Sequence, residues 1–192
     1  MERRKDSRPI RLWVGILLIL AAAVIAFCVS RALEKRTYRL MYPDLIGQYA
    51  AENAIDPYLV AAVIHTESSN LPEAVSRSGA AGLMQIMPDT GAWIAEKLEI
   101  ADFTTERLFE PALNIRFGCW YLRFLMDTFE GDRQLILAAY HAGQGNVARW
   151  LEDPEIATDG QLTNIPFGET EHYVEKVQRA YEKYRTLYPG AW

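Results

Sequence analysis

The amino-acid sequence predicts a predominantly α-helical protein, with an apolar helix near the N-terminus followed by a helical domain. Three observations support this prediction. A run without charges covers Leu12–Val29, and prolines stand at the start of several amphipathic segments. No stretch shows the alternation of apolar and polar residues that half-buried strands require. With 192 residues, the chain is long enough for one domain behind a short N-terminal extension.

The apolar run of 18 residues is near the lower length limit for a helix that crosses a bilayer. Five Lys/Arg precede it and four follow it, which weakly favours the N-terminus on the cytoplasmic side. A cleaved signal peptide is the alternative, but the run is long for one and no small-x-small site follows it. We therefore expect an uncleaved anchor with the folded domain outside the cytoplasmic membrane. The expected division is a basic segment at 1–11, a transmembrane anchor at 12–29, a juxtamembrane stalk at 30–42 and the domain at 43–192.

The domain reads as a succession of helices. Asp56 and Asp132 are good N-cap residues, and Pro43, Pro88 and Pro111 each suit the first helical position. Stretches rich in small and polar residues at 68–82 and 152–168 predict loops. The expected helices are 43–54, 57–67, a short turn at 83–87, 88–98, 111 to just before 131, 133–141, 146–151 and 169–187.

Charge is distributed unevenly between the two parts of the chain. Residues 1–40 contain nine Lys/Arg and three Asp/Glu, whereas residues 41–192 contain eleven and twenty-two. An acidic domain without a basic stripe does not fit nucleic acid as a partner. Cys28 lies in the apolar run and Cys119 in a helical segment, so no disulfide is expected.

One carboxyl group stands out at the end of the second domain helix. Val63 and Ile64 lie one helical turn before Glu67, on the same face. A carboxyl group above apolar side chains loses solvation of its charged form, so its pKa should rise. That is how a glutamate is kept protonated near neutral pH for use as a general acid. A solvated glutamate at a helix terminus is the alternative.

The residues that follow Glu67 favour the first interpretation. Four segments occur in order: ESSNLP at 67–72, GAAGLMQIMP at 79–88, AYHAGQGNV at 139–147 and IPFGET at 165–170. With the pattern PxxNIxxG at 111–118, they resemble the lysozyme-like catalytic domain of the soluble-type lytic transglycosylases, a domain related to goose-type lysozyme. The resemblance covers roughly residues 43–185 and implies a lysozyme-like helical domain behind the N-terminal transmembrane helix.

The resemblance also implies a reaction. The family cleaves the β-1,4 bond between N-acetylmuramic acid (MurNAc) and N-acetylglucosamine (GlcNAc) in peptidoglycan and leaves a 1,6-anhydro ring. Glu67 would be the single catalytic carboxylate, first general acid and then base. An ordinary glycosidase needs two carboxyl groups, but here the attacking oxygen belongs to the substrate. No cofactor is implied, and peptidoglycan strands would be the partner. The sequence does not show whether the protein serves a cell-envelope complex.

Further positions match family residues that contact sugar. Gln85 offers a donor and an acceptor for a hydroxyl or N-acetyl group, and Met87 would line the groove, although methionine is more often a core residue. Tyr140 would place its hydroxyl near the acid, or pack in the core. The substrate-binding residues implied are Ser68, Ser76, Gln85, Met87, Tyr140, His141 and Glu169. For Ser68 the alternative is capping a helix end, and for Glu169 it is a surface or capping role.

Two positions depart from the family pattern. His141 stands where an asparagine is usual; it keeps a donor and an acceptor but introduces titration near pH 6.5. Asn70 stands where an aromatic residue is usual. We expect both departures to affect the sugar preference of the subsites more than the type of reaction.

Other classes of function remain open as alternatives. A lysozyme-type hydrolase on the same fold would use a water molecule held by a second carboxylate. A catalytically weak wall-binding module is the other alternative. The spacing of Glu169 and His172 suits a helical metal motif, but it occurs once, so no metal site is expected.

Overall fold

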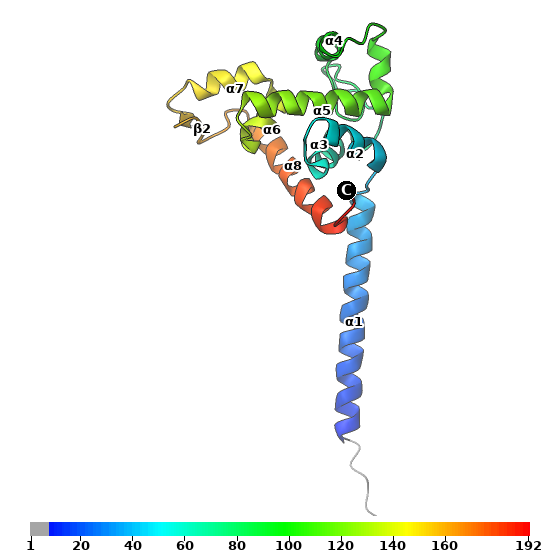
Figure 1. Cartoon of the computed structure of the whole chain (residues 1–192). Helices are drawn as coiled ribbons and strands as arrows, with labels where there is room; N and C mark the ends of the chain where they lie inside the picture. Colours follow the sequence, from blue (N-terminus) through cyan, green and yellow to red (C-terminus); the bar gives the residue numbers. More distant parts are fainter. Residues whose placement is uncertain (1–7) are drawn as a thin grey trace, which may run out of the picture. The chain divides into compact units, whose positions relative to one another are not determined.

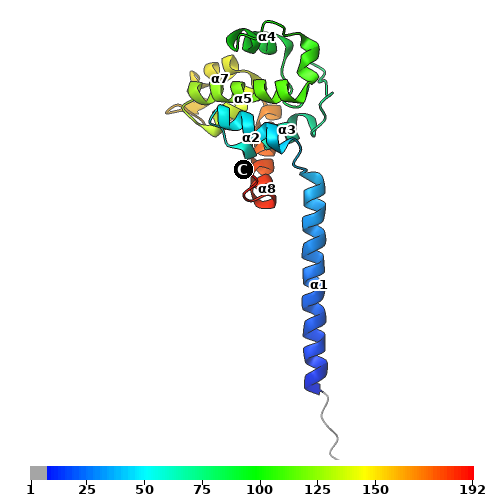
Figure 2. The same ribbon diagram turned by 45° about the vertical axis from the view of Figure 1, so that its right-hand side comes forward.

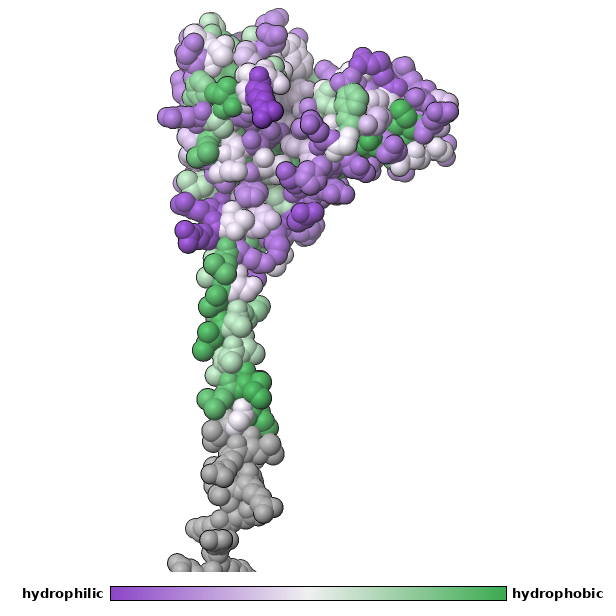
Figure 3. All heavy atoms as spheres, turned by 180° about the vertical axis from the view of Figure 1, so that it is seen from behind, coloured by the Kyte–Doolittle hydropathy of each residue, from purple (hydrophilic) through white to green (hydrophobic). Residues whose placement is uncertain are grey.

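The computed structural model describes residues 8–192, and the chain divides into two units, Met1–Arg39 and Leu40–Trp192. The first unit contains helix α1 (Arg8–Thr37). Residues 1–7 of the predicted basic segment lie outside the described residues. Within α1, Gly15–Thr37 is long and apolar enough to cross a membrane. Its large side chains are exposed, as the apolar (green) surface of this helix shows in Figure 3.

The second unit is built almost entirely of helices, as the sequence predicts (Figure 1). In chain order its elements are α2 (Pro43–Glu52), α3 (Pro57–Ser68), α4 (Pro88–Lys97), the 3-10 helix η1 (Thr105–Phe109), α5 (Pro111–Thr128), α6 (Arg133–Ala142), α7 (Gln144–Leu151), β1 (Ala157–Thr158), β2 (Gln161–Leu162) and α8 (Gly168–Leu187). Proline occupies the start of α2, α3, α4 and α5, where its missing N–H costs no hydrogen bond.

Helix α3 forms the centre of this unit. Four of its residues, Val60, Ala62, Val63 and Ile64, have no exposed surface. It packs along α8 and also contacts α2, which in turn packs on α5 (Figures 1 and 2). A helix that is apolar nearly all round must be covered on most sides. This burial fixes the place of the residue at its C-terminal end.

The expectation that the chain forms no strand is wrong at one place. Strands β1 and β2 pair antiparallel within the predicted loop at 152–168, with Ala157 opposite Leu162. The two residues between them, Asp159 and Gly160, both have positive φ, at 53° and 76°. Asp-Gly favours such a tight hairpin turn. Strands of two residues are too short to show alternation, so only the turn signals them.

Candidate active site

Helix α3 places Glu67 in its last turn. The Asp56 carboxylate caps the start of the helix by accepting a hydrogen bond from the Tyr58 backbone N–H at 2.9 Å. The helix ends at Ser68, because Ser69 and Asn70 adopt left-handed conformations with φ of 53° and 68°. Glu67 is thereby held at the junction between a rigid buried helix and a sharply turning loop.

The environment of Glu67 favours its neutral form. Val63 and Ile64, one turn below, are fully buried, and burial raises the pKa of the Glu67 carboxyl to about 7. The hydroxyl of Tyr173 acts in the opposite direction by hydrogen bonding to the carboxyl. That contact is loose, because the buried hydroxyl does not reach strict hydrogen-bond geometry with any described atom. Glu67 is therefore set to exchange a proton near neutral pH.

Two buried tyrosines accompany Glu67. Burial and the neighbouring Glu67 raise the pKa of both Tyr140 and Tyr173 well above the usual range. Both hydroxyls thus stay protonated near neutral pH. Tyr140 donates to the Met84 carbonyl at 2.8 Å, and this bond joins α6 to the loop that precedes α4.

That loop folds back on itself before α4. Ala81 bridges to both Val75 and Ile86, and Gln85 has a φ of 49°. The Gln85 amide nitrogen donates to the carbonyls of Ala74, at 3.0 Å, and Gly82, at 2.8 Å. The amide nitrogen is thus used to hold the loop, which leaves the amide oxygen as the end suited to a ligand donor.

Helix α5 holds this loop in place through the side chain of Asn114. The buried Asn114 side chain accepts from the Met84 N–H at 2.7 Å and donates to the carbonyls of Ala81 and Leu108. Gly82 has a φ of 80°, and a Cβ there would collide with Asn114. A Cβ on Gly118 of α5 would collide with the Met84 side chain. Small residues are therefore required on both sides of this contact.

A cleft of about 240 Å³ opens beside the loop. Its lining residues are Gln85, Ile86, Met87, Thr90, Tyr121, Tyr140, His141, Ala142 and Gly143. It brings together four residues that the sequence singled out, from two separate segments: Gln85 and Met87 before α4, and Tyr140 and His141 in the last turn of α6. Glu67 is not among the lining residues, but its charge acts on Tyr140, and Tyr140 lines the cleft.

His141 is held by α8. One ring nitrogen, Nδ1, lies 3.0 Å from the Thr170 hydroxyl, and the ring stacks on Tyr173 with centroids 4.6 Å apart. Burial lowers the pKa of His141, and the charge of Glu169 opposes this shift. A neutral imidazole whose Nδ1 accepts from Thr170 carries its proton on Nε2. Such a ring offers a donor to the cleft.

The other predicted site residues lie differently. Ser68 is buried, and its hydroxyl donates to the Ile64 carbonyl at 3.0 Å within α3. Ser76 is exposed in the loop, and its hydroxyl accepts from the Ala80 N–H. Glu169 is exposed in the first turn of α8, where its charge acts on His141.

Sequence reasoning missed several residues that shape the site. The sequence does not distinguish Tyr173 from the packing residues of the closing helix, and it does not single out Thr90 or Tyr121. Asn114 was quoted in a motif without a role. A polar residue next to the apolar stripe of α5 was the available signal for Asn114, because a buried amide needs partners.

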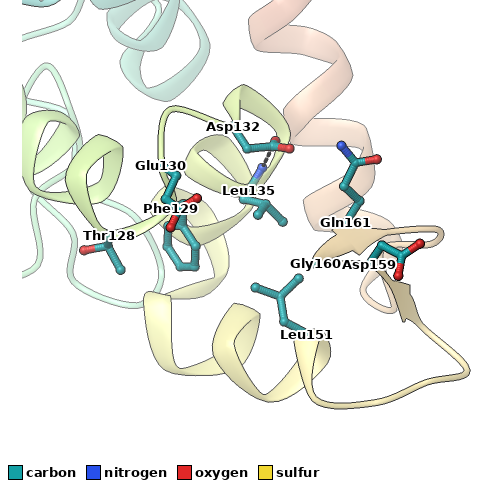
Figure 4. A pocket seen from close by; sticks show the side chains of 9 residues that line it. All are labelled: Thr128, Phe129, Glu130, Asp132, Leu135, Leu151, Asp159, Gly160 and Gln161. Carbon is teal, nitrogen blue, oxygen red and sulfur yellow. Dashed lines mark hydrogen bonds between the residues drawn. The ribbon is translucent and has the colours of Figure 1, made fainter.

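A larger cavity, of about 450 Å³, lies elsewhere, where the end of α5 and the start of α6 meet the β1–β2 turn (Figure 4). Three carboxylates, those of Glu130, Asp132 and Asp159, line it. The Asp132 carboxylate is engaged in capping α6 through the N–H groups of Gln134 and Leu135. None of the site residues predicted from the sequence lines this cavity, so its size does not make it the candidate active site.

Comparison with known proteins gives concordant results. Residues 44–161 match the family described as "Transglycosylase SLT domain". The chain is 36% identical over 161 residues to the soluble lytic murein transglycosylase of Salmonella typhimurium, covering 82% of this chain and 25% of that protein. It is 32% identical to the membrane-bound lytic murein transglycosylase C of Yersinia pestis, covering 82% and 49%. The solved structure of the 70 kDa soluble lytic transglycosylase of Escherichia coli superposes with a TM-score of 0.74 at 31% identity, covering 81% and 26%. The chain thus spans between a quarter and a half of the length of these proteins.

Proposed function

Because the chain belongs to the transglycosylase SLT domain family, we propose that it is a lytic transglycosylase of peptidoglycan. The substrate bond would be the β-1,4 linkage from MurNAc to GlcNAc. The observation that carries the proposal is the Glu67 carboxyl, whose pKa burial raises to about 7 beside a preformed cleft. The named activities of the similar proteins support the same reaction.

In the proposed mechanism Glu67 acts twice. Its neutral carboxyl donates a proton to the glycosidic oxygen as the bond from that oxygen to C1 of MurNAc breaks. The resulting carboxylate then accepts the proton of the C6 hydroxyl, whose oxygen bonds to C1 and closes the 1,6-anhydro ring. Glu67 ends protonated, as it began, so no water is consumed.

The surroundings of Glu67 support a reaction with one carboxylate. No Asp or Glu occurs among the residues that line the cleft. Glu73 and Asp89, which are near Glu67 in sequence, are both exposed. A hydrolase would need a second carboxylate to activate water, and the lining of the cleft supplies none.

The cleft residues would bind and orient the sugars. The Gln85 amide oxygen and the His141 ring suit hydroxyl or N-acetyl groups, and the Met87 side chain, 41% exposed, offers a soft apolar surface. Tyr173 would supply a hydroxyl donor near the acid, whereas the Tyr140 hydroxyl, which donates to the Met84 carbonyl, would accept a hydrogen bond from the sugar. Ser68, Ser76 and Glu169 complete the proposed set, with Ser68 supporting the end of α3 from inside the helix.

We also propose that α1 is a single-pass anchor and that the domain acts outside the cytoplasmic membrane. Its apolar stretch and its exposed large side chains support insertion in a bilayer. Peptidoglycan lies on that side of the membrane, and a tethered domain would act on strands near the surface.

Digestion of purified sacculi tests the function. The full chain in detergent should release muropeptides lighter by one water than hydrolysed products, as read by mass spectrometry. Products with the full hydrated mass would indicate a hydrolase, and binding without release would indicate a wall-binding module. Glu67→Gln should abolish release while thermal unfolding stays cooperative, and full activity in this variant would refute the assignment of the acid.

A further inference from the structure

Four aromatic side chains cluster between α4 and α5, next to the cleft. Trp93 of α4 contacts three rings of α5 edge-on: Trp120 at 5.1 Å, Phe124 at 5.0 Å and Tyr121 at 6.4 Å between centroids. On α5, the rings of Trp120 and Phe124 are nearly parallel, at 5.9 Å. We refer to Trp93, Trp120, Tyr121 and Phe124 as the aromatic wall.

Core packing alone does not account for the wall. The buried residues of α4 are Gly91, Ile94 and Ala95, and they already seat the helix on the domain. All four wall residues are instead half-buried, so part of each ring remains at the surface. Four large rings thus lie together with part of each in contact with water, and apolar groups gathered at the surface are a feature of binding sites.

The wall connects two hollows. Tyr121 lines the cleft and tilts against Tyr140 at 5.5 Å. At the other end, Trp120 lines a second hollow of about 180 Å³ together with Glu52, Asn53, Leu98 and Arg116. Thr90 in the cleft and Leu98 in the hollow are separated by eight residues along α4, roughly 12 Å at 1.5 Å per residue.

The second hollow has the chemistry of a sugar site. A pyranose ring presents apolar C–H faces and a rim of hydroxyl and amide groups. The part of the half-buried Trp120 ring that Trp93 and Phe124 leave uncovered offers an apolar surface for such a face. Glu52 accepts one hydrogen bond from Gln48, and Asn53 donates one to the Tyr49 carbonyl. These two side chains and the Arg116 guanidinium have further acceptor and donor atoms for the rim. An acidic peptide or a nucleic acid would instead call for a basic surface.

We propose that the aromatic wall and the Trp120 hollow extend the glycan-binding surface beyond the cleft, so that a strand of β-1,4-linked amino sugars binds along α4. This inference rests on the proposed function, since it takes the cleft as the site of cleavage. This surface would bind the same strand that is cleaved in the cleft, through sugars distant from the scissile bond. Binding energy gained there holds long strands in place and leaves short ones unaffected.

The test compares β-1,4-linked GlcNAc oligosaccharides of two lengths. The full chain in detergent carries Glu67→Gln so that no turnover occurs, and titration calorimetry measures the dissociation constants of the trisaccharide and the hexasaccharide. We expect the hexasaccharide to bind about tenfold more tightly, which corresponds to about 1.4 kcal/mol. Trp120→Ala in this background should reduce that difference to within about twofold and leave trisaccharide affinity unchanged.

Trp120→Phe is the matched control, because it keeps a ring in the hollow and should retain most of the length preference. Thermal unfolding of both variants separates loss of the surface from loss of the fold. Equal hexasaccharide affinity in the parent and in Trp120→Ala would overturn the inference while leaving the proposed function intact. Failure of the parent to bind either oligosaccharide would instead overturn the proposed function, and this inference with it.

Discussion

The hydroxyl of Tyr173 on α8 acts on the carboxyl of Glu67 at the end of α3, although the two residues are far apart in the sequence. The packing of α3 along α8 produces this pairing. Burial raises the pKa of the carboxyl, and the hydroxyl restrains that rise. The proton affinity of the proposed acid is therefore a property of the contact between two helices.

The first expectation concerns the pH dependence of cleavage. The first step needs neutral Glu67, and its pKa is about 7. We expect kcat/KM for sacculus digestion to fall about tenfold per pH unit above that value, because the protonated fraction falls by that factor. Initial rates of muropeptide release between pH 5 and 9 measure the profile. A rate that stays constant up to pH 9 would contradict the role of Glu67 as the acid.

The second expectation is that Glu67→Gln stabilises the domain at alkaline pH. The folded-state pKa of about 7 lies above the unfolded value of 4.5. Glu67 therefore makes its full contribution to the stability of the wild-type domain below pH 4.5, and this contribution is lost as pH rises through 7. The shift corresponds to about 3 kcal/mol at most. Urea unfolding at pH 5 and pH 8 measures the free energy of unfolding. The difference between Glu67→Gln and the wild type should be more favourable to the variant at pH 8 than at pH 5. Glu73→Gln, at an exposed site, is the control, and its difference from the wild type should be the same at both pH values.

The third expectation concerns Tyr173→Phe. The hydroxyl lowers the pKa of Glu67, so its removal should raise that pKa further and move the alkaline limb of the rate profile to higher pH. Tyr140→Phe is the matched control, because that hydroxyl donates to the Met84 carbonyl. The control should lose about 1 kcal/mol in the free energy of unfolding, while the alkaline limb of its rate profile stays at the same pH as in the wild type. Identical limbs in the wild type and Tyr173→Phe would show that the hydroxyl has no influence on the acid.

Local signals in the sequence were sufficient to predict the helices and the apolar residues next to Glu67. Asp56 and Pro57 set the start of α3, and the helical period placed Val63 and Ile64 beneath the carboxyl, where the structure has them. The helical class of the domain followed from the same signals and is confirmed.

The contacts between distant segments could not be obtained in that way. Nothing in the helical period of α8 distinguishes Tyr173 from a core residue, because its role depends on which helix it packs against. Asn114 likewise acquires its three partners only when α5 passes under the loop. The stacking of His141 on Tyr173 is a further example.

The fourth expectation is that Asn114→Ala loosens the loop that carries Gln85. The substitution leaves the Met84 N–H and the carbonyls of Ala81 and Leu108 without their buried partner. We expect a loss of roughly 3 kcal/mol in the free energy of unfolding, measured with urea, and a fall in kcat/KM of more than about tenfold as Gln85 loses its position. Asn146→Ala removes one partly buried bond, to the Ala142 carbonyl, and one exposed bond, from Arg149, and should cost about 1 kcal/mol or less. Equal losses in both variants would contradict the structural role of Asn114.

The last expectation uses the departure at His141. The pKa of His141 is lowered from 6.5 by burial, with Glu169 opposing, so the ring is neutral at pH 7 and gains a proton only in more acidic solution. Protonation would make both ring nitrogens donors, so that Nδ1 could only donate to the Thr170 hydroxyl, and it would place a positive charge on the ring that stacks on Tyr173. The wild-type rate should therefore decline at acid pH.

His141→Asn restores the amide usual in the family and cannot titrate, so the acid decline should disappear while the rate at pH 7 changes by less than about tenfold. Stability supplies an independent readout. A depressed histidine pKa gives stability that is present above 6.5 and lost as pH falls through the folded value. In thermal unfolding, the Tm of the variant relative to that of the wild type should therefore be higher at pH 5 than at pH 7.5. If the acid limb persists in His141→Asn, the titrating group is a different one and the role given to His141 is wrong.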